Sequence, residues 1–515
     1  MTKKENSGGT VGFIFVAIVL SKLLGLLRGS AVALFYGTDY VASAYSMASQ
    51  IPVNFFDMIL GSAVSSAFIP VYNKFYETDG RKRADGFASR FINLITVVTV
   101  LLSVIGVASS PHIIKVMGSG MAPQAANLAS QLLKIMFPLV IFTGLAFSLV
   151  GILQSLGEFK IPAIMSLVSN LVCIVYLFTM NDRFGIYGLS AALLIGWAMQ
   201  FVILIYPAKR RGFSYSLKSG FLDSGFKDVA KLALPVLLAS WVQPINTMVN
   251  IGIASGLSDG SGIAVLDYAN KLYIIAASAF SMAVTNYIFP RLSKLSATGS
   301  KREWSDTLKS SIRTVVFVVL PIMIVFLCGS EEIIRIIYGR GQFGEESVQM
   351  TSAVLQFYSL GMIWFALQEI FNKAFYSVMD SKTPVISAVG GIVINVILSY
   401  ILSGSMGVCG LALAASVSAL VCCIFSFIML KRKTDGMKNL SILKLVISGL
   451  LGLTVCIIAR QFALGIIVGE GFISSLLVLL ISAAACGLVY IASAFLLKVK
   501  ETEIIGKLIK GLIKR

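Results

Sequence analysis

The sequence predicts an all-α polytopic membrane protein with about fourteen transmembrane helices. Hydrophobic residues make up 57% of the 515 residues, charged residues 13%, and the mean hydropathy is +0.88. Soluble globular domains carry about 25% charged residues, so this composition excludes that class. The apolar residues fall in runs of about twenty, which is long enough to cross a bilayer as a helix. No run alternates with a period of two, which argues against a transmembrane β-barrel.

Short polar turns separate the apolar runs and fix their order. The start of the chain, MTKKENSGGT, is not followed by a short apolar core with a small-residue cleavage site, so the first span is expected to be retained. The predicted spans are 10–36, 41–72, 87–110, 124–154, 160–180, 185–207, 228–256, 262–290, 308–328, 347–376, 383–403, 406–430, 441–463 and 472–497.

The net charge of +18 comes mainly from Lys and Arg in every second loop. This is the positive-inside pattern, and with an even number of spans it predicts that both termini are cytoplasmic. The seven cysteines lie mostly in apolar runs, and the only histidine is His112. We therefore expect the cysteines to be small apolar fillers, with no metal site and no cofactor.

Two halves of the chain resemble each other. Ser155, Glu158, Lys160 and Pro162 recur 222 positions later as Ser377, Asp380, Lys382 and Pro384, and Gly188-Leu189 recurs as Gly410-Leu411. Six spans separate the copies, which predicts a parallel repeat about an axis along the membrane normal. The predicted parts are an N-terminal six-helix half (1–207), a cytoplasmic linker that is a candidate for the membrane surface (208–227), a C-terminal six-helix half (228–430), two extra transmembrane helices (431–498) and a basic amphipathic cytoplasmic tail (499–515).

Three cations interrupt apolar runs. Lys22 and Arg28 lie in the first span and Lys271 in the eighth. A charge near the bilayer centre costs several kcal/mol, so such residues usually face a water-filled cavity or a partner and mark a functional path. Because the cluster is positive, it predicts an anionic substrate. Two structural explanations stay open: the first two cations snorkel to opposite membrane faces, and Lys271 is neutralised by Asp267, one turn earlier.

Other polar residues in the spans are weaker candidates. Asp57, Asp267, Asn270 and Glu369 are candidates for the cavity or for coupling to a cation. Asn246, Asn250, Asn395 and Ser399 form two pairs, each one turn apart, whose oxygens are candidate ligands for a small cation or partners in interhelical hydrogen bonds. Prolines within spans predict kinks at Pro52, Pro138, Pro235, Pro244 and Pro321.

Signatures of an enzyme are absent from the sequence. It has no Gly-x-x-x-x-Gly-Lys-Ser/Thr loop to hold nucleotide phosphates and no loop long enough for a soluble catalytic domain. We therefore predict a transport protein rather than an enzyme.

Several blocks of residues resemble the MurJ (MviN) family of bacterial lipid II flippases. The resemblance runs from about residue 10 to residue 430, and the two extra spans also fit it. It rests on Ser21-Lys22, Leu24-Gly25, Arg28, Gly37-Thr38, Ile51-Pro52, Ala67-Phe68-Ile69-Pro70-Val71, Tyr268-Ala269-Asn270-Lys271-Leu272, Phe289-Pro290-Arg291-Leu292-Ser293 and, more specifically, Tyr338-Gly339-Arg340-Gly341-Gln342-Phe343 and Lys373-Ala374-Phe375-Tyr376-Ser377 with Asp380, Lys382, Thr383 and Pro384.

The resemblance implies a MATE-like fold of the multidrug/oligosaccharidyl-lipid/polysaccharide (MOP) exporter superfamily. It implies alternating access that moves lipid II, an undecaprenyl-pyrophosphate-linked precursor of peptidoglycan, between leaflets during cell-wall biogenesis. The family's essential cavity arginines fall on Lys22, Arg28 and Lys271, the extra spans are expected to hold the polyprenyl tail, and cell-wall synthesis proteins are expected partners. The chain departs from the family at Ser43, Phe56-Asp57 and Gly61-Ser62-Ala63, and the acids of the family's sodium site fall near Asn250 and Ser399, neither of which is acidic.

Other functions fit parts of this pattern. A flippase for another undecaprenyl-pyrophosphate-linked glycan needs the same cations. A cation-coupled drug exporter shares the fold but favours an acidic cavity, and a non-transporting scaffold for cell-wall enzymes needs no cavity charge.

Overall fold

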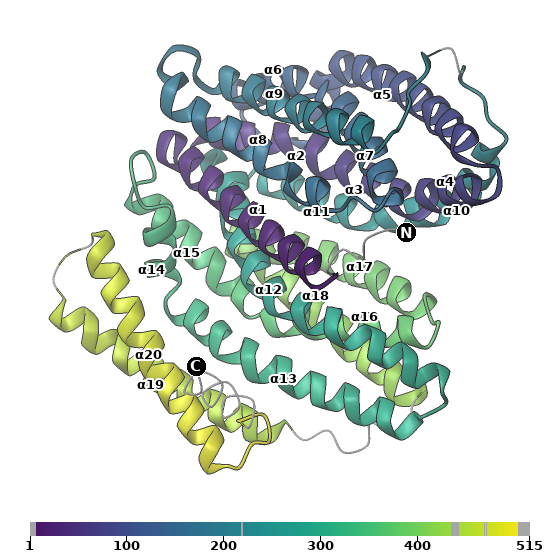
Figure 1. Cartoon of the computed structure of the whole chain (residues 1–515). Coiled ribbons are helices and arrows are strands. Elements are labelled where there is room, and N and C mark those ends of the chain that lie inside the picture. The colour runs from purple at the N-terminus through teal and green to yellow at the C-terminus, as the bar shows by residue number, and fades with distance from the viewer. Residues whose placement is uncertain (1–6, 218–219, 434–441, 468, 470, 503–515) are drawn as a thin grey trace. The chain divides into compact units, whose positions relative to one another are not determined.

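The structure is a computed structural model that describes residues 7–217, 220–433, 442–467, 469 and 471–502, and in this part of the chain every regular element is a helix (Figure 1). The elements are α1 (Ser7–Tyr36), α2 (Tyr40–Gln50), α3 (Phe56–Ala63), α4 (Ile69–Thr78), α5 (Arg81–Met117), α6 (Pro123–Met136), α7 (Leu139–Ser155), α8 (Lys160–Thr179), α9 (Asn181–Arg210), α10 (Gly225–Ser240), α11 (Val242–Ala254), α12 (Gly262–Ala297), α13 (Lys301–Cys328), α14 (Ser330–Ile337), α15 (Glu345–Ser359), α16 (Met362–Ser377), α17 (Lys382–Met406), α18 (Val408–Lys433), α19 (Leu443–Ile466) and α20 (Phe472–Leu496).

Each predicted span coincides with one helix or with consecutive helices. Within the described residues, ten helical segments are long and apolar enough to cross a membrane, and the bent pair α15 and α16 raises the number to eleven. The predicted number of fourteen is therefore not confirmed. The predicted spans outside this set are 41–72, 228–256 and 262–290, which coincide with α2 to α4, α10 with α11, and α12.

Proline accounts for some of the breaks between helices. Pro52 lies in a π-helical stretch, Ile51–Phe55, and Pro138 lies between α6 and α7. Pro244 lies in the first turn of α11, just after the break from α10. The predicted kinks at Pro235 and Pro321 do not end a helix, since both residues lie inside one, α10 and α13.

Contacts divide the chain into two compact units, Met1–Ala264 and Val265–Arg515. In the first unit, aromatic side chains fill the core around Phe68, which lies 4.6 Å from Phe91 and 5.6 Å from Phe87 between ring centroids. In the second unit, α19 and α20 pack on α13, where Cys456 and Cys486 lie against Ile324. The seven cysteines are free thiols, and four of them are buried: Cys173, Cys423, Cys456 and Cys486.

The internal repeat extends to the helices. α6 and α15 begin 222 positions apart, as do α8 and α17, and α5 has its counterpart in α13 with α14. The helices that follow α8 and α17 are α9 and α18, and each packs closely on the helix before it. The predicted two-fold repetition of sequence thus reflects a repeated order of helices.

Backbone turns with positive φ recur at the same interval. Gly185 and Gly407 have φ of 51° and 56°, and Gly157 has φ of 76° where its counterpart Met379 has φ of 58°. An L-residue other than Gly pays about 1–2 kcal/mol in the left-handed region. Met379 is 96% exposed, so no packing contact explains why methionine rather than glycine occupies this left-handed position.

Replacing Met379 by glycine is therefore expected to stabilise the protein. The left-handed strain disappears, partly offset by the greater freedom of glycine in the unfolded chain, so the free energy of unfolding should rise by about 0.5–1 kcal/mol. The reciprocal Gly157→Met variant should lower it by about 1–2 kcal/mol. Thermal unfolding of both variants measures this, and a destabilised Met379→Gly variant contradicts it.

A carboxylate cap recurs at the same two turns. Glu158 and Asp380 each accept a hydrogen bond of 3.1 Å from the backbone N–H two residues later, at the start of α8 and α17. Each carboxylate also pairs with a cation: Glu158 lies 2.5 Å from Arg211, at the end of α9, and Asp380 pairs with Lys433, at the end of α18. Arg211 and Lys433 are also 222 positions apart. The ends of α9 and α18 are thus tied to the preceding turn in the same way.

These contacts lower the pKa of both carboxyls. Burial opposes ionisation, but the hydrogen bond from Arg211 and that from the backbone lower the pKa of Glu158. For Asp380, burial is outweighed by hydrogen bonds from Lys433 and Thr383, which lower its pKa from 3.8 to about 2. A carboxyl whose pKa is depressed by folding stabilises the folded state only while it is ionised.

We therefore expect Asp380 to make stability depend on pH. Its contribution is complete above about pH 4 and is lost as the pH falls through about 2. The Asp380→Asn variant should show a smaller drop in melting temperature between pH 4 and pH 2 than the wild type. Equal drops in the two proteins would contradict this assignment.

Candidate functional site

The two cations of the first span lie on α1 where it packs against α8. Lys22 and Arg28 are both half-buried. Arg28 interacts electrostatically with the thiol of Cys173 on α8. Gly25 lies between the two cations, and a Cβ built on it would be 3.9 Å from Nδ2 of Asn170, which is an ordinary van der Waals distance, so packing against α8 does not require glycine at this position.

Lys271 forms an ion pair on α12. Its Nζ lies 2.6 Å from Oδ2 of Asp267, and the two side chains are 39% and 13% exposed. Nζ also lies 5.8 Å from the ring centroid of Tyr268. The half-buried Asn270 precedes Lys271. Lys271 thus keeps an exposed fraction that a ligand can reach, although its charge is balanced locally.

The family-like motif after α14 supports the helix that carries Lys271. Tyr338 and Phe343 are buried, and their rings lie 4.9 Å and 5.7 Å from that of Tyr268. Arg340 of the same motif lies 4.8 Å from the ring centroid of Phe472 at the start of α20. The motif therefore joins α12 to the extra helices through aromatic contacts.

Asp57 and Glu369 are acidic candidates within the spans, and the structure describes the side chain of Glu369 only. Glu369 is half-buried on α16 and interacts electrostatically with Lys373, whose Nζ lies 5.5 Å from the ring centroid of Phe289. Asp57 lies in α3, but its side chain is outside the described part of the structure. A role of either acid in coupling stays a prediction.

The candidate cation ligands fall on two helices in different units. Asn246 and Asn250 lie on α11, and Asn395 and Ser399 are buried on α17. The side-chain oxygen of Asn246 is buried without a hydrogen-bond partner, whereas the other three residues have partners. Among the residues that the structure describes, no group of three or more His, Cys, Asp or Glu is arranged to hold a metal. The cation site stays a prediction.

Sequence reasoning missed a buried carboxylate in the linker. Asp223 is 1% exposed, and its oxygens lie 2.7 Å and 2.8 Å from the guanidinium of Arg83 and 2.7 Å from that of Arg90, both on α5. Tyr215 donates a hydrogen bond of 2.6 Å to Asn93. The described part of the linker is therefore fastened to the first turns of α5, and its predicted place at the membrane surface stays a prediction.

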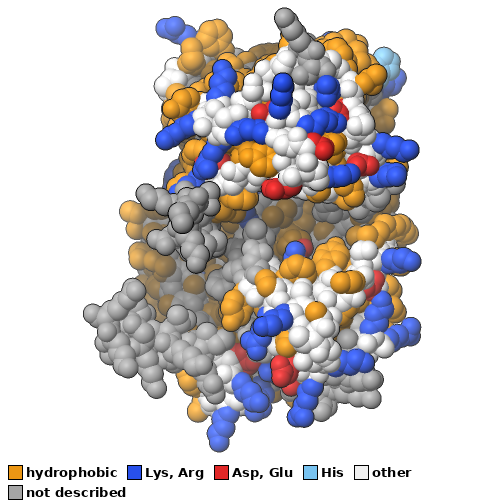
Figure 2. Space-filling view, turned by 45° about the vertical axis from the view of Figure 1, so that its right-hand side comes forward, with side chains coloured by type: hydrophobic (Ala, Val, Ile, Leu, Met, Phe, Trp, Pro, Cys, Tyr) orange, Lys and Arg blue, Asp and Glu red, His pale blue; other side chains and the backbone are white. Residues whose placement is uncertain are grey.

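The charges on the surface are mixed rather than uniformly basic. On the face that Figure 2 shows, a few Asp and Glu side chains lie among the Lys and Arg side chains. Burial opposes ionisation of Asp223, but the hydrogen bonds from Arg83, Gly225 and Arg90 lower its pKa. The pairing joins residues 133 to 140 positions apart, which no local pattern in the sequence signals.

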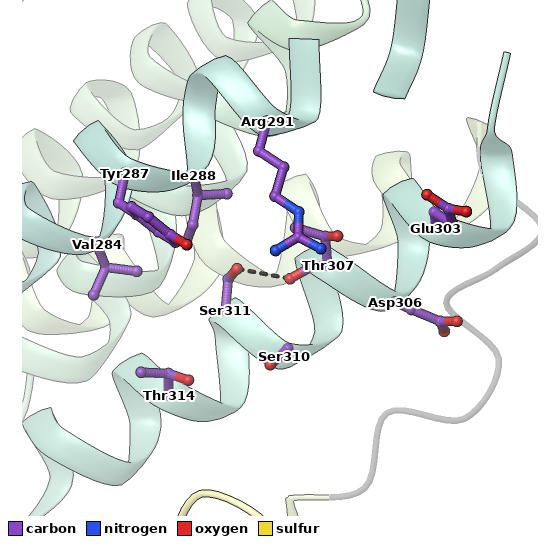
Figure 3. Close-up of a pocket in the computed structure, with 10 residues that line it drawn as sticks. All are labelled: Val284, Tyr287, Ile288, Arg291, Glu303, Asp306, Thr307, Ser310, Ser311 and Thr314. Carbon is purple, nitrogen blue, oxygen red and sulfur yellow. Dashed lines mark hydrogen bonds between the residues drawn. The ribbon is translucent and has the colours of Figure 1, made fainter. Parts of the chain in front are cut away.

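A cavity of about 680 Å³ lies between α12 and α13 (Figure 3). Arg291 reaches from α12 toward Thr307 and Ser311 of α13, and Ser311 donates a hydrogen bond of 2.7 Å to the carbonyl of Thr307. None of the residues predicted to bind substrate lines this cavity.

Solved structures with similar folds are membrane transporters. One described as a lipid II flippase MurJ in an inward closed conformation matches with a TM-score of 0.80 and 25% identity, over 94% of this chain and 98% of that one. An inward-facing MATE-family multidrug resistance transporter of the MOP superfamily matches with a TM-score of 0.68 over 82% of this chain and 99% of that one, at 14% identity, which shows the fold alone. The chain is thus a multi-pass membrane protein with the fold of these transporters.

The comparison of sequences gives the family. The family model described as lipid II flippase MurJ matches residues 32–483. Proteins of Rhizobium meliloti and Bdellovibrio bacteriovorus, both described as probable lipid II flippase MurJ, are 28% identical to the chain over 415 and 425 residues, which cover 79% and 81% of this chain and 77% and 81% of theirs. The chain belongs to the MurJ family of lipid II flippases. It is a family of transporters and not of enzymes, and the resemblance noted in the sequence is confirmed.

Proposed function

We propose that this protein moves lipid II from the inner to the outer leaflet of a bacterial inner membrane by alternating access of its two six-helix halves. The observation that carries the proposal is the match of residues 32–483 to the lipid II flippase family. The relatives and the 25% identical solved structure bear the same description. The positive loops further support a topology with both termini in the cytoplasm.

The chemistry of the substrate fits the cations in the spans. The pyrophosphate of lipid II is anionic, and Lys22, Arg28 and Lys271 are the proposed ligands in a central cavity. Arginine suits bidentate contact with phosphate oxygens, and lysine acts as a compact point charge. The 39% exposure of Lys271 supports its availability to a ligand despite the pair with Asp267.

The remaining residues have supporting roles in this proposal. The groove beside α19 and α20 is the proposed place of the polyprenyl tail, since these helices are apolar and lie outside the repeat. Asp57, Asn270 and Glu369, and the amide and hydroxyl groups of α11 and α17, are proposed contributors to coupling with a cation or with the membrane potential.

Complementation tests the proposal. A bacterial strain depleted of its own lipid II flippase should grow when it makes this protein and should lyse without it. A matched strain depleted of a flippase for another undecaprenyl-pyrophosphate-linked glycan should not be rescued. Rescue of the second strain alone would transfer the proposal to that other class of glycan.

A further inference from the structure

A cationic pocket lies at the beginning of α13, and none of the residues proposed to bind the transported substrate lines it. The pocket has a volume of about 520 Å³, within the range of about 300–1,000 Å³ that is usual for small-molecule sites. Four cations line it, and Asp306 is the only acid that does so among the described residues. The cations are Lys301, Arg302, Lys309 and Lys433.

Lys309 is the partly buried cation of this pocket that has only a distant partner. Its side chain is only 15% exposed, and its ion pair with Asp306 is long, 3.9 Å, with an Asp306 side chain that is 64% exposed. Burying an ammonium group is costly unless a close partner compensates it. Lys433 is in contrast bound to Asp380. The ammonium group of Lys309 can therefore also bind an anion at a shorter distance than that to Asp306.

The start of α13 adds neutral donors to the pocket. Ser305 is 2% exposed and lines the pocket, yet its hydroxyl has no hydrogen-bond partner within the described residues. Ser300, which precedes the helix, makes no capping hydrogen bond with its side chain. The N–H groups of a first helical turn find no acceptor within their own helix, and the helix dipole favours an anion there.

The internal repeat offers a direct comparison. The related helices α5 and α13 begin 220 positions apart. In the first turns of α5, Arg83 binds Asp223 of the linker, and Phe87 is buried and packs on Phe226 at 5.9 Å between ring centroids. In the first copy the beginning of the helix is thus covered by a carboxylate and an aromatic ring of the chain itself. In the first turns of α13, a lysine and an unpaired hydroxyl line a cavity instead.

We propose that this pocket binds a phosphate-bearing anion. Lys309 and Arg302 supply charge, and the hydroxyl of Ser305 and the first turn of α13 supply hydrogen bonds to phosphate oxygens. Trp304 keeps one wall in place because its Nε1 donates a hydrogen bond of 3.0 Å to Ser377. The anion is either a soluble phosphate compound or the headgroup of an anionic phospholipid, which present the same oxygens.

Two binding measurements on the full-length protein distinguish these sources. In phosphatidylcholine nanodiscs, calorimetric titration with pyrophosphate tests for a soluble ligand. In detergent micelles that contain phosphatidylcholine and phosphatidylglycerol, native mass spectrometry tests for selective retention of the anionic lipid. Binding in one of the assays identifies the source, and it supports the proposal only if the pocket variants described next weaken it, because the transport cations are also proposed to bind pyrophosphate. Binding in neither assay overturns the proposal.

Variants then assign the binding to the pocket. Lys309→Gln should weaken binding at least about tenfold and Ser305→Ala about threefold, as expected for one charged and one neutral hydrogen bond. Lys294→Gln is the matched control, because it removes the same charge from an exposed position on α12 outside the pocket and should leave binding unchanged. Arg302→Gln is a second, exposed test position in case Lys309→Gln does not fold. Equal weakening by Lys294→Gln, or no weakening by Lys309→Gln and Arg302→Gln, overturns the proposal.

Discussion

Arg28→Gln and Lys271→Gln are each expected to abolish the growth that this protein supports in cells depleted of their own flippase. Both variants keep a polar side chain but lose the charge proposed to bind the pyrophosphate. A charge-assisted hydrogen bond to phosphate contributes about 1.5–3 kcal/mol, so each loss should slow transport by roughly 10- to 150-fold. Growth assays with variants that insert normally measure the effect. Lys294→Gln, which removes a charge on α12 outside this site, should grow like the wild type.

The ion pair with Asp267 allows a sharper test of Lys271. If Lys271 only neutralises Asp267, the double variant Asp267→Asn with Lys271→Gln should restore transport, because no buried charge is left unpaired. If Lys271 binds the substrate, the double variant should stay inactive. We expect the second outcome. Restored growth in the double variant would reduce Lys271 to a packing role.

Asp223→Ala should have the largest effect on stability. Removal of this carboxylate leaves Arg83 and Arg90 facing each other across a site where Asp223 was 1% exposed. The side chains of the two arginines are 28% and 31% exposed, so water can partly replace the carboxylate, and we expect the free energy of unfolding to fall by about 1.5–3 kcal/mol.

Asp228→Ala is the matched control for this prediction. Asp228 lies five residues later and also pairs with a cation, Lys74 at 3.1 Å, but the two side chains are 42% and 60% exposed. An exposed pair of this kind contributes about 0–1 kcal/mol. Thermal unfolding followed by circular dichroism in detergent compares the variants. Similar melting temperatures for Asp223→Ala and Asp228→Ala would contradict the account of the linker.

The positions of the helices were predictable because hydropathy and repetition are local properties of the sequence. The interval of 222 positions joins α6 to α15 and α8 to α17, and it also relates the caps at Glu158 and Asp380. The prediction of a single continuous span at 41–72 was too simple. It is a series of short helices with π-helical stretches at Ile51–Phe55 and Val64–Phe68. A hydropathy pattern does not register such local changes in hydrogen bonding.

The site was predictable only in part, because charge within a span marks a residue but not its partner. Lys271 was correctly linked to Asp267, since residues four apart share a helix face. The contact of Arg28 with Cys173 and the ion pairs of Asp223 with Arg83 and Arg90 join positions that are distant in the sequence. They depend on packing, which the sequence alone does not show. The tail with Ile504, Ile505, Leu508 and Leu512 lies outside the described residues, so its amphipathic helix stays a prediction.

The most direct test of the account is the leaflet in which lipid II is found in cells that depend on this protein alone. An externally added enzyme or label that cannot cross the inner membrane reports only lipid II in the outer leaflet. We expect lipid II to be accessible with the wild-type protein and to remain protected with Arg28→Gln. Lipid II that stays protected while the wild-type protein is present and inserted would contradict the central claim.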